Sequence, residues 1–273
     1  MSIGLFKRKK KSASESWNAK TMFGAGLSFA VSEAYKLLRT NIQFSFSNEG
    51  TGHVIGVTSS IQSEGKSSSI CNLAYAMAED GARVVLLDGD LRRPSIASKL
   101  GLARSPGLTN LLVSRGEYQD VIQHCAAAPR LDIITAGDIP PNPSELLGSN
   151  RMAALLQELR QNYDYILVDL PPVTVVSDAV AMSKVLDGVV VVVRNAVAEQ
   201  KMLAEAIRQL KMVNVRILGF AFRDTQPNGG RYGAKYGKRY KYYKYYRSYA
   251  ESASRAHKRA AAAAGQRRSA PKE

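Results

Sequence analysis

The stretch "HVIGVTSSIQSEGKSSS", residues 53–69, joins a short apolar run to a glycine-lysine-serine turn. The β-branched residues of 53–59 favour a buried strand. The "GKS" at 65–67 matches the end of a phosphate-binding loop, in which backbone N–H groups, the lysine and the hydroxyl contact phosphates and Mg²⁺. Ser60 occupies the position at which the phosphate-loop pattern usually has its first glycine. "GKS" alone is common, but the strand before it and the amphipathic helix after it favour the phosphate loop.

The chain around this stretch alternates short β-branched runs with helical patterns. The expected strands cover 53–59, 82–88, 131–135, 163–169, 187–193 and 215–222. The expected helices cover 32–46, with Ser32 as its cap, and approximately 66–80, 150–162, 178–185 and 199–212. Near-continuous apolar strands separated by helices indicate a parallel sheet covered on both faces. The sequence therefore predicts an α/β fold of the P-loop NTPase type, with a doubly wound, mostly parallel sheet.

Composition predicts one domain with two basic ends. The chain has 273 residues, is 45% hydrophobic and carries a formal charge of +15, and a chain of this size can bury one sizeable core. The charge lies at the ends, which leaves the body nearly neutral. We expect a basic flexible segment over 1–30, a P-loop domain over 31–228 and a disordered, basic, tyrosine-rich tail over 229–273.

The same composition bears on location. No apolar run approaches the ~18–20 residues of a membrane span, and the basic N-terminus lacks the apolar stretch of a signal peptide. Cys71 and Cys125 have no metal-type spacing, so we expect them in helices as small apolar residues in a reducing compartment. The expectation is a chain inside the cell that meets a membrane through a partner or through its basic ends.

Acidic side chains mark the ends of two predicted strands. Asp88 ends the strand at 82–88, Asp90 follows it, and Asp169 ends the strand at 163–169. Because the carboxyl ends of parallel strands meet at one edge of a doubly wound sheet, these carboxylates should lie beside the phosphate loop. Solvated turns are the alternative. Three acidic strand ends beside one phosphate loop favour a site for a nucleotide and a metal ion.

Several longer motifs resemble those of one family. "LLDGDLRRP" (86–94) and "ILVDLPP" (166–172) resemble the second Walker A and the Walker B motifs of bacterial tyrosine kinases. "GDIPPNPSELL" (137–147) is similar to a loop of these enzymes, and "EAYKLLRTNIQFS" (33–45) resembles their N-terminal oligomerisation helix. Together with the tyrosine-rich C-terminus, they make the chain similar to the stand-alone cytoplasmic kinases of capsular and exopolysaccharide biosynthesis.

The resemblance implies an ATP-dependent protein tyrosine kinase that uses Mg²⁺. Lys66 would offset charge on the γ-phosphate, Asp88 would accept the proton of the incoming tyrosine, and Asp90 would support the metal. The implied metal ligands are Ser67, Asp90 and Asp169. The implied nucleotide contacts are Ser63, Glu64, Gly65, Lys66, Ser67 and Ser68.

The cationic tail then has an expected role as substrate. Eight of the chain's 13 tyrosines lie close together there, and we expect autophosphorylation in trans at Tyr232, Tyr236, Tyr240, Tyr242, Tyr243, Tyr245, Tyr246 and Tyr249. Basic residues interleaved with aromatics also describe a single-strand nucleic-acid binder or an adhesive tail. Beside a kinase-like site a phosphoacceptor tail is favoured, and no specific nucleic-acid partner is expected.

The implied partners are a membrane activator's cytoplasmic segment, further copies of this chain in a ring, and a phosphotyrosine phosphatase. The ring would use Glu33, Lys36 and Arg39, with Lys36 standing where the family has arginine. Arg223 stands where an asparagine often touches the adenine.

A positioning-type ATPase is a rival function, but such ATPases have an extra lysine early in the phosphate loop, which this chain lacks. The second rival function is that of a non-catalytic, nucleotide-binding subunit of an export complex.

Overall fold

The computed structural model describes residues 24–46, 50, 52–114, 116–195 and 199–223. Its centre is a seven-stranded sheet in the order β3-β4-β2-β5-β1-β6-β7. The strands are β1 (His53–Ser59), β2 (Val84–Asp88), β3 (Ile122–His124), β4 (Leu131–Ile134), β5 (Tyr165–Asp169), β6 (Gly188–Arg194) and β7 (Ile217–Arg223). All neighbouring pairs in it are parallel except β3 with β4. The predicted α/β, mostly parallel sheet is confirmed.

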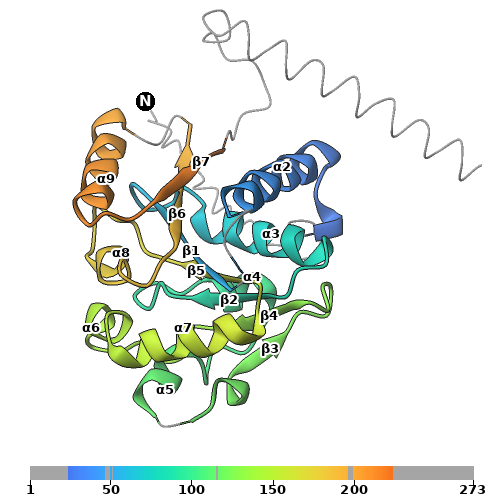
Figure 1. Cartoon of the computed structure of the whole chain (residues 1–273), viewed down its shortest axis with the longest axis vertical. Helices are drawn as coiled ribbons and strands as arrows, with labels where there is room; N and C mark the ends of the chain where they lie inside the picture. The colour runs from blue at the N-terminus through green and yellow to red at the C-terminus, as the bar shows by residue number, and fades with distance from the viewer. Residues whose placement is uncertain (1–23, 47–49, 51, 115, 196–198, 224–273) are drawn as a thin grey trace, which may run out of the picture.

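Helices cover both faces of the sheet (Figure 1). They are α2 (Phe29–Ser45), α3 (Lys66–Glu79), α4 (Ile96–Leu100), α5 (Leu108–Val113), α6 (Pro143–Leu147), α7 (Asn150–Asn162), α8 (Asp178–Ala181) and α9 (Gln200–Met212). Short 3-10 turns lie at η1 (Gly24–Gly26) and η2 (Tyr118–Asp120). Figure 1 shows α2 and α3 together on one side, with α6 and α7 on the other.

Alternate residues along each strand pack into two separate hydrophobic cores, one on each face of the sheet. Ile55 and Leu86 pack with α2, α3 and α4, whereas the neighbouring Val54 and Leu87 pack with the helices from α5 to α9. Successive strand side chains point to opposite faces, so a strand covered on both sides must be apolar at every position. The continuous apolar runs noted in the sequence are the direct consequence of this arrangement.

Four local expectations were wrong. Strand β3 was missed, because it has only three residues and is partly exposed. Ser32 does not cap α2: the helix begins earlier, after Ser28, and the Ser32 N–H already donates to the Ser28 carbonyl within the first turn. Helix α8 ends at Ala181, well before residue 185. Cys125 follows β3 and is not helical, whereas Cys71 lies buried in α3 as expected.

Helix α2 is fastened to α3 by a partly buried arginine. Nη1 of Arg39 donates to the Ala76 carbonyl at 3.0 Å, and Nη2 lies 3.2 Å from an Asp80 carboxylate oxygen. These partners form the C-terminal end of α3, where a cation is favourable. The Arg39 side chain is 14% exposed, so its charge is directed into its own chain.

The first prediction concerns this attachment. Arg39→Ala should lower the free energy of unfolding by about 1–3 kcal/mol, because it leaves a helix-end carbonyl and a carboxylate without their charged donor. Arg208→Ala is the matched control, since Arg208 pairs with Glu205 on the surface of α9 and is 62% exposed. Urea unfolding of both variants measures the difference. Equal losses for the two variants would show that the Arg39 contacts add nothing beyond a surface pair.

Candidate active site

The phosphate loop links β1 to the first turn of α3. Two of its residues, Ser63 and Gly65, have positive φ angles of 66° and 87°. Gly65 is the N-cap of α3, and Lys66 is the first residue of the helix. The loop therefore directs the N-terminal end of a 14-residue helix toward the carboxyl edge of the sheet, an arrangement that binds anions.

A buried glutamate holds the loop from inside. Oε2 of Glu64 accepts hydrogen bonds from the Ser60 hydroxyl at 2.8 Å and the Ile61 N–H at 2.9 Å. Its Oε1 accepts from the backbone N–H of Arg194, at the end of β6, at 3.2 Å. Ser60 thus replaces the usual glycine with a hydroxyl that ties the loop together. The side chain of Glu64, predicted to contact the nucleotide, is used inside the loop, which leaves only its backbone for phosphate.

Lys66 lies between two buried carboxylates. Its Nζ is 2.7 Å from Asp90 Oδ2 and 3.3 Å from Asp169 Oδ1. Nζ is also 3.4 Å from the Ser67 hydroxyl. Asp169 is fully buried and Lys66 is about nine-tenths buried, so these charges must compensate one another. The loop lysine and the two strand-end aspartates are brought together as the sequence predicts.

Asp88 completes the cluster and is held in a fixed orientation. It faces Asp169 across the paired strands β2 and β5. Its Oδ2 accepts from the backbone N–H groups of Ser95 and Ile96, at the start of α4, at 3.2 and 3.0 Å. Within the described residues, its Oδ1 is buried and has no hydrogen-bond partner. One carboxylate oxygen is therefore anchored by two backbone N–H groups, and the other makes no hydrogen bond within the described residues.

Burial shifts the protonation of this cluster. Burial, followed by the nearby charge of Asp169, raises the pKa of Asp88 to about 7. Burial also raises the pKa of Asp169, although the charge of Lys66 opposes this. For Lys66, burial acts to lower the pKa, but the charges of Asp169 and Asp90 outweigh it and raise the pKa above its usual value. Lys66 therefore stays charged, and Asp88 titrates near neutrality.

The cluster fits a magnesium–nucleotide complex. Asp169 Oδ2 is buried without a hydrogen-bond partner in the described part of the chain, and the Ser67 hydroxyl lies beside it. The described residues contain no group of three or more His, Cys, Asp or Glu side chains suited to hold a metal ion by themselves. Mg²⁺ commonly takes one or two carboxylates and completes its shell with phosphates and waters. Ser67, Asp90 and Asp169 match that pattern.

The two arginines after Asp90 have separate partners. Arg92 makes two hydrogen bonds to the buried Asp178, with Nε at 3.0 Å and Nη2 at 3.1 Å. Asp178 also accepts from the Ser144 hydroxyl, which belongs to the 137–147 loop. Arg93 donates through Nη1 to the Gln62 side chain at 2.7 Å. Among contacts of the described residues, neither guanidinium pairs with Asp88 or Asp90.

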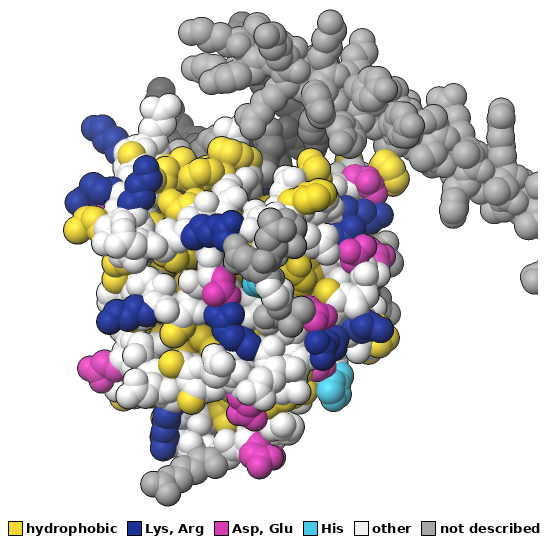
Figure 2. Space-filling view, viewed as in Figure 1, with side chains coloured by type: hydrophobic (Ala, Val, Ile, Leu, Met, Phe, Trp, Pro, Cys, Tyr) yellow, Lys and Arg dark blue, Asp and Glu magenta, His cyan; other side chains and the backbone are white. Residues whose placement is uncertain are grey.

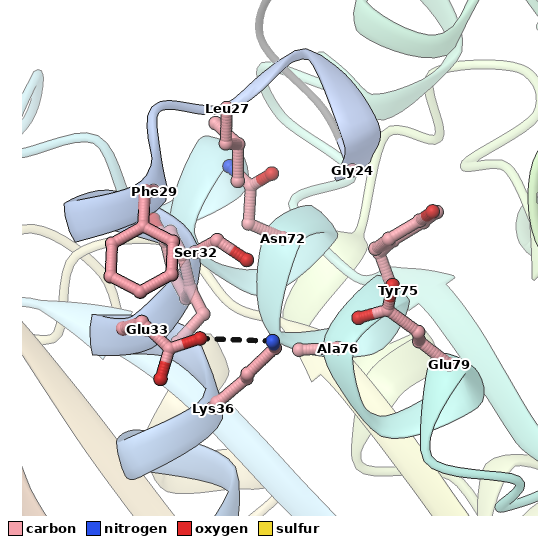
Figure 3. Close-up of a pocket in the computed structure, with 11 residues that line it drawn as sticks. Gly24, Leu27, Phe29, Ser32, Glu33, Lys36, Asn72, Tyr75, Ala76 and Glu79 are labelled. Carbon is pink, nitrogen blue, oxygen red and sulfur yellow. Dashed lines mark hydrogen bonds and ion pairs between the residues drawn. The ribbon is translucent and has the colours of Figure 1, made fainter. Parts of the chain in front are cut away.

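The residues predicted for oligomerisation lie away from this cluster. Glu33 and Lys36 form an ion pair at 2.9 Å and line a pocket of about 300 Å³ between α2 and α3, together with Asn72 and Tyr75 (Figure 3). Arg39 points toward the end of α3 instead. The eight phosphoacceptor tyrosines of 232–249 lie outside the described residues.

Comparison with known proteins identifies the family. The AAA domain family matches residues 52–218. The tyrosine-protein kinase YwqD of Bacillus subtilis is 36% identical over 188 residues, which cover 69% of this chain and 78% of YwqD. The chain belongs to the bacterial tyrosine kinase family. Several other tyrosine kinases of this family are much longer, and the chain spans 26–27% of their length.

Solved structures agree with this assignment. The chimerical protein CapA2B2 is 33% identical, with a TM-score of 0.67 over 72% of this chain and 85% of that one. A more distant likeness, 16% identical with a TM-score of 0.53 over 63% of this chain and 74% of the other, is to the cobyrinic acid a,c-diamide synthase of Mycobacterium smegmatis, solved with an ATP analog and magnesium. At that identity the likeness concerns the fold alone.

The second prediction follows from the raised pKa of Asp88. Between the usual aspartate pKa of about 4 and a pKa of about 7, the folded state binds the proton more strongly than the unfolded state. The contribution of Asp88 to the free energy of unfolding therefore falls as pH rises from about 4 to about 7. Asp88→Asn removes the titration, and in metal-free buffer it should be more stable than the wild type by up to about 4 kcal/mol at pH 8.

The advantage of Asp88→Asn should shrink as pH is lowered toward 4. Chemical unfolding at a series of pH values, with EDTA present, measures it. Asp120→Asn is the control, because Asp120 is an exposed carboxylate in η2. A stability difference that is independent of pH would contradict a raised pKa at Asp88.

Proposed function

We propose that this chain is an ATP- and Mg²⁺-dependent protein tyrosine kinase that phosphorylates the tyrosines of its own 232–249 segment. The observation that carries the proposal is the buried cluster of Lys66, Asp88, Asp90 and Asp169 at the phosphate loop. Structural ion pairs do not require a carboxylate oxygen that is buried and unpaired, as Asp88 Oδ1 is among the described residues. A proton acceptor needs an oxygen with a free lone pair.

The chemistry asks the protein mainly for positioning and charge. Lys66 would leave the carboxylates for the γ-phosphate, where its charge offsets the charge that develops during transfer. Ser67, Asp90 and Asp169 would hold Mg²⁺, which would supply positive charge that offsets the charge of the phosphates. The backbone N–H groups of the loop and of the first turn of α3, from Ser63 to Ser68, would receive the remaining phosphate oxygens.

Asp88 would take the proton of the tyrosine hydroxyl. A phenol has a pKa of about 10, so an ordinary carboxylate with a pKa of about 4 is a poor acceptor for its proton. The pKa of about 7 at Asp88 narrows that gap. The two N–H groups of α4 hold Oδ2, so Oδ1 is the atom that would accept the proton as the phosphoryl group is transferred. The elevated pKa is thus useful in the reaction and unfavourable for the resting fold.

The wider role that we propose is control of capsular or exopolysaccharide polymerisation and export. The chain would act in the cytoplasm, at the inner face of the cell membrane, through a membrane activator. A phosphotyrosine phosphatase would reverse the reaction. A membrane-spanning helix is not found in the part of the chain that the structure describes.

Assembly would use α2, with a division of roles among its charged residues. Lys36 and Glu33 are 41% and 34% exposed and can meet a neighbouring copy, whereas Arg39 secures α2 to its own chain. Exposed apolar side chains also lie on α2 and β7, including Leu37, Phe44 and Phe222. Figure 2 shows apolar surface gathered near the top of the view, in the region where Figure 1 places β7 and α2. A ring of copies would cover part of this surface.

The third prediction tests the chemistry. Lys66→Ala and Asp88→Asn should each reduce phosphorylation of residues 232–249 by at least about 100-fold while the fold is retained. Lys66→Ala should also weaken nucleotide binding, since a phosphate contact is lost. Asp88→Asn should leave ATP affinity nearly unchanged, because ATP need not touch this side chain. Mass spectrometry of the tail after incubation with Mg·ATP measures the product.

Matched controls are Lys201→Ala and Asp120→Asn, which remove the same charges from exposed positions on α9 and η2. Both should phosphorylate normally. Wild-type tail phosphorylation by Asp88→Asn would remove Asp88 from the mechanism.

The fourth prediction concerns which tail is used. A tail that starts just after β7 reaches its own site poorly when tethered close by, so a neighbour's site is the easier destination. A mixture of a chain shortened after residue 228 and full-length Lys66→Ala should yield phosphorylated Lys66→Ala chains. The rate should rise with total protein concentration. If the Lys66→Ala chains stay unphosphorylated while wild-type chains alone become phosphorylated, the transfer takes place within one chain.

A further inference from the structure

Arg223, the last residue of β7, lies against the phosphate loop. Its Nη1 donates to the carbonyl oxygen of Gly65 at 3.2 Å. A side-chain carbon added to Gly65 would lie only 1.5 Å from that nitrogen. Glycine is favoured at 65 because its φ of 87° is left-handed, and the Arg223 guanidinium occupies the space beside it.

The sheet fixes this position of Arg223. Arg223 is paired in register with Arg194, and the Asn195 N–H donates to the Arg223 carbonyl at 2.8 Å. Arg194 also reaches the loop, with Nη1 3.2 Å from the Ser63 carbonyl oxygen. The ends of β6 and β7 thus each deliver a guanidinium to the same loop. Arg194 contacts its outer part, and Arg223 contacts the residue at which α3 begins.

Arg223 lies beside the N-terminal end of α3. That end carries partial positive charge, which acts against a guanidinium placed there. Lys99 of α4 is close enough to respond to the same charges: partial burial is the main cause that lowers its pKa, Cys71 and Asp169 oppose this, and the charges of Lys66 and Arg223 lower it further. Cations that converge on a helix N-terminus would be stabilised by a bound polyphosphate.

We propose that Arg223 is a phosphate-contacting residue of the nucleotide site. This rests on the nucleotide binding proposed above and adds a residue to it. On binding, the guanidinium would exchange the Gly65 carbonyl for a phosphate oxygen, a stronger charge-assisted bond that its planar fork can make in bidentate form. The assignment differs from the role suggested by the sequence position, where the family often has an asparagine that touches the adenine.

The choice of ligands distinguishes a contact between Arg223 and the phosphates from a contact between Arg223 and the adenine base. Calorimetric titration of the full chain with ATP, inorganic tripolyphosphate and adenosine is compared for the wild type, Arg223→Ala and Arg223→Lys. Arg223→Ala should bind both ATP and tripolyphosphate about tenfold or more weakly, the usual loss for a hydrogen bond to a charged group. Arg223→Lys should recover part of that loss. Adenosine binding should not change, and Arg208→Ala, with the same charge change on α9, should resemble the wild type.

Other outcomes overturn the assignment. A loss with ATP and adenosine but not with tripolyphosphate would place Arg223 at the base. Unchanged affinities together with a lower melting temperature for Arg223→Ala would make it a support for the loop alone. A wild-type chain that binds neither ATP nor tripolyphosphate would overturn the nucleotide site itself, and the wild-type titration alone shows this.

Discussion

The rest of the structure depends on the buried contact between Lys66 and the carboxylates of Asp90 and Asp169, at 2.7 and 3.3 Å. Charges this deeply buried are tolerable only when they compensate one another closely. Both cores hold the elements that bring them together: β2 and β5 supply the strand ends, and α3 supplies the lysine. The phosphate loop, the start of α4 and the end of β6 are then fixed around this contact by hydrogen bonds.

The same contact explains why the site is suited to phosphoryl transfer. One lysine cannot fully compensate three buried carboxylates. The pKa of Asp88 is therefore raised to about 7, so that near neutral pH a proton can cancel part of the excess negative charge. A divalent cation and a polyphosphate would change this balance, because the cation binds the carboxylates and the phosphates attract Lys66. In this account, substrate binding relieves an electrostatic cost that is built into the fold.

The sequence predicts the parts of the site that follow from strand ends. Asp88 and Asp169 end apolar strands and Asp90 follows the first of them. The ends of parallel strands share one edge, so the sequence predicts that the three carboxylates lie together beside the loop of Lys66. The contacts of Glu64 with Arg194 and of Arg92 with Asp178 could not be found this way, because these partners are 130 and 86 residues away. Strand β3 was missed for a related reason: its three residues gain their structure from pairing with β4, not from local pattern. Arg223 was noticed as a departure, but its contact with Gly65 required the fold.

The most direct test of the central claim is to count both products of one reaction, ADP and tail phosphotyrosine, for the purified full-length chain with Mg·ATP. The account predicts that phosphotyrosine in residues 232–249 rises in step with ADP until the tail is filled. ADP formed without phosphotyrosine would contradict it and indicate an ATPase of the positioning type. Nucleotide binding with neither product, with an activator segment supplied, would indicate a regulatory nucleotide-binding module.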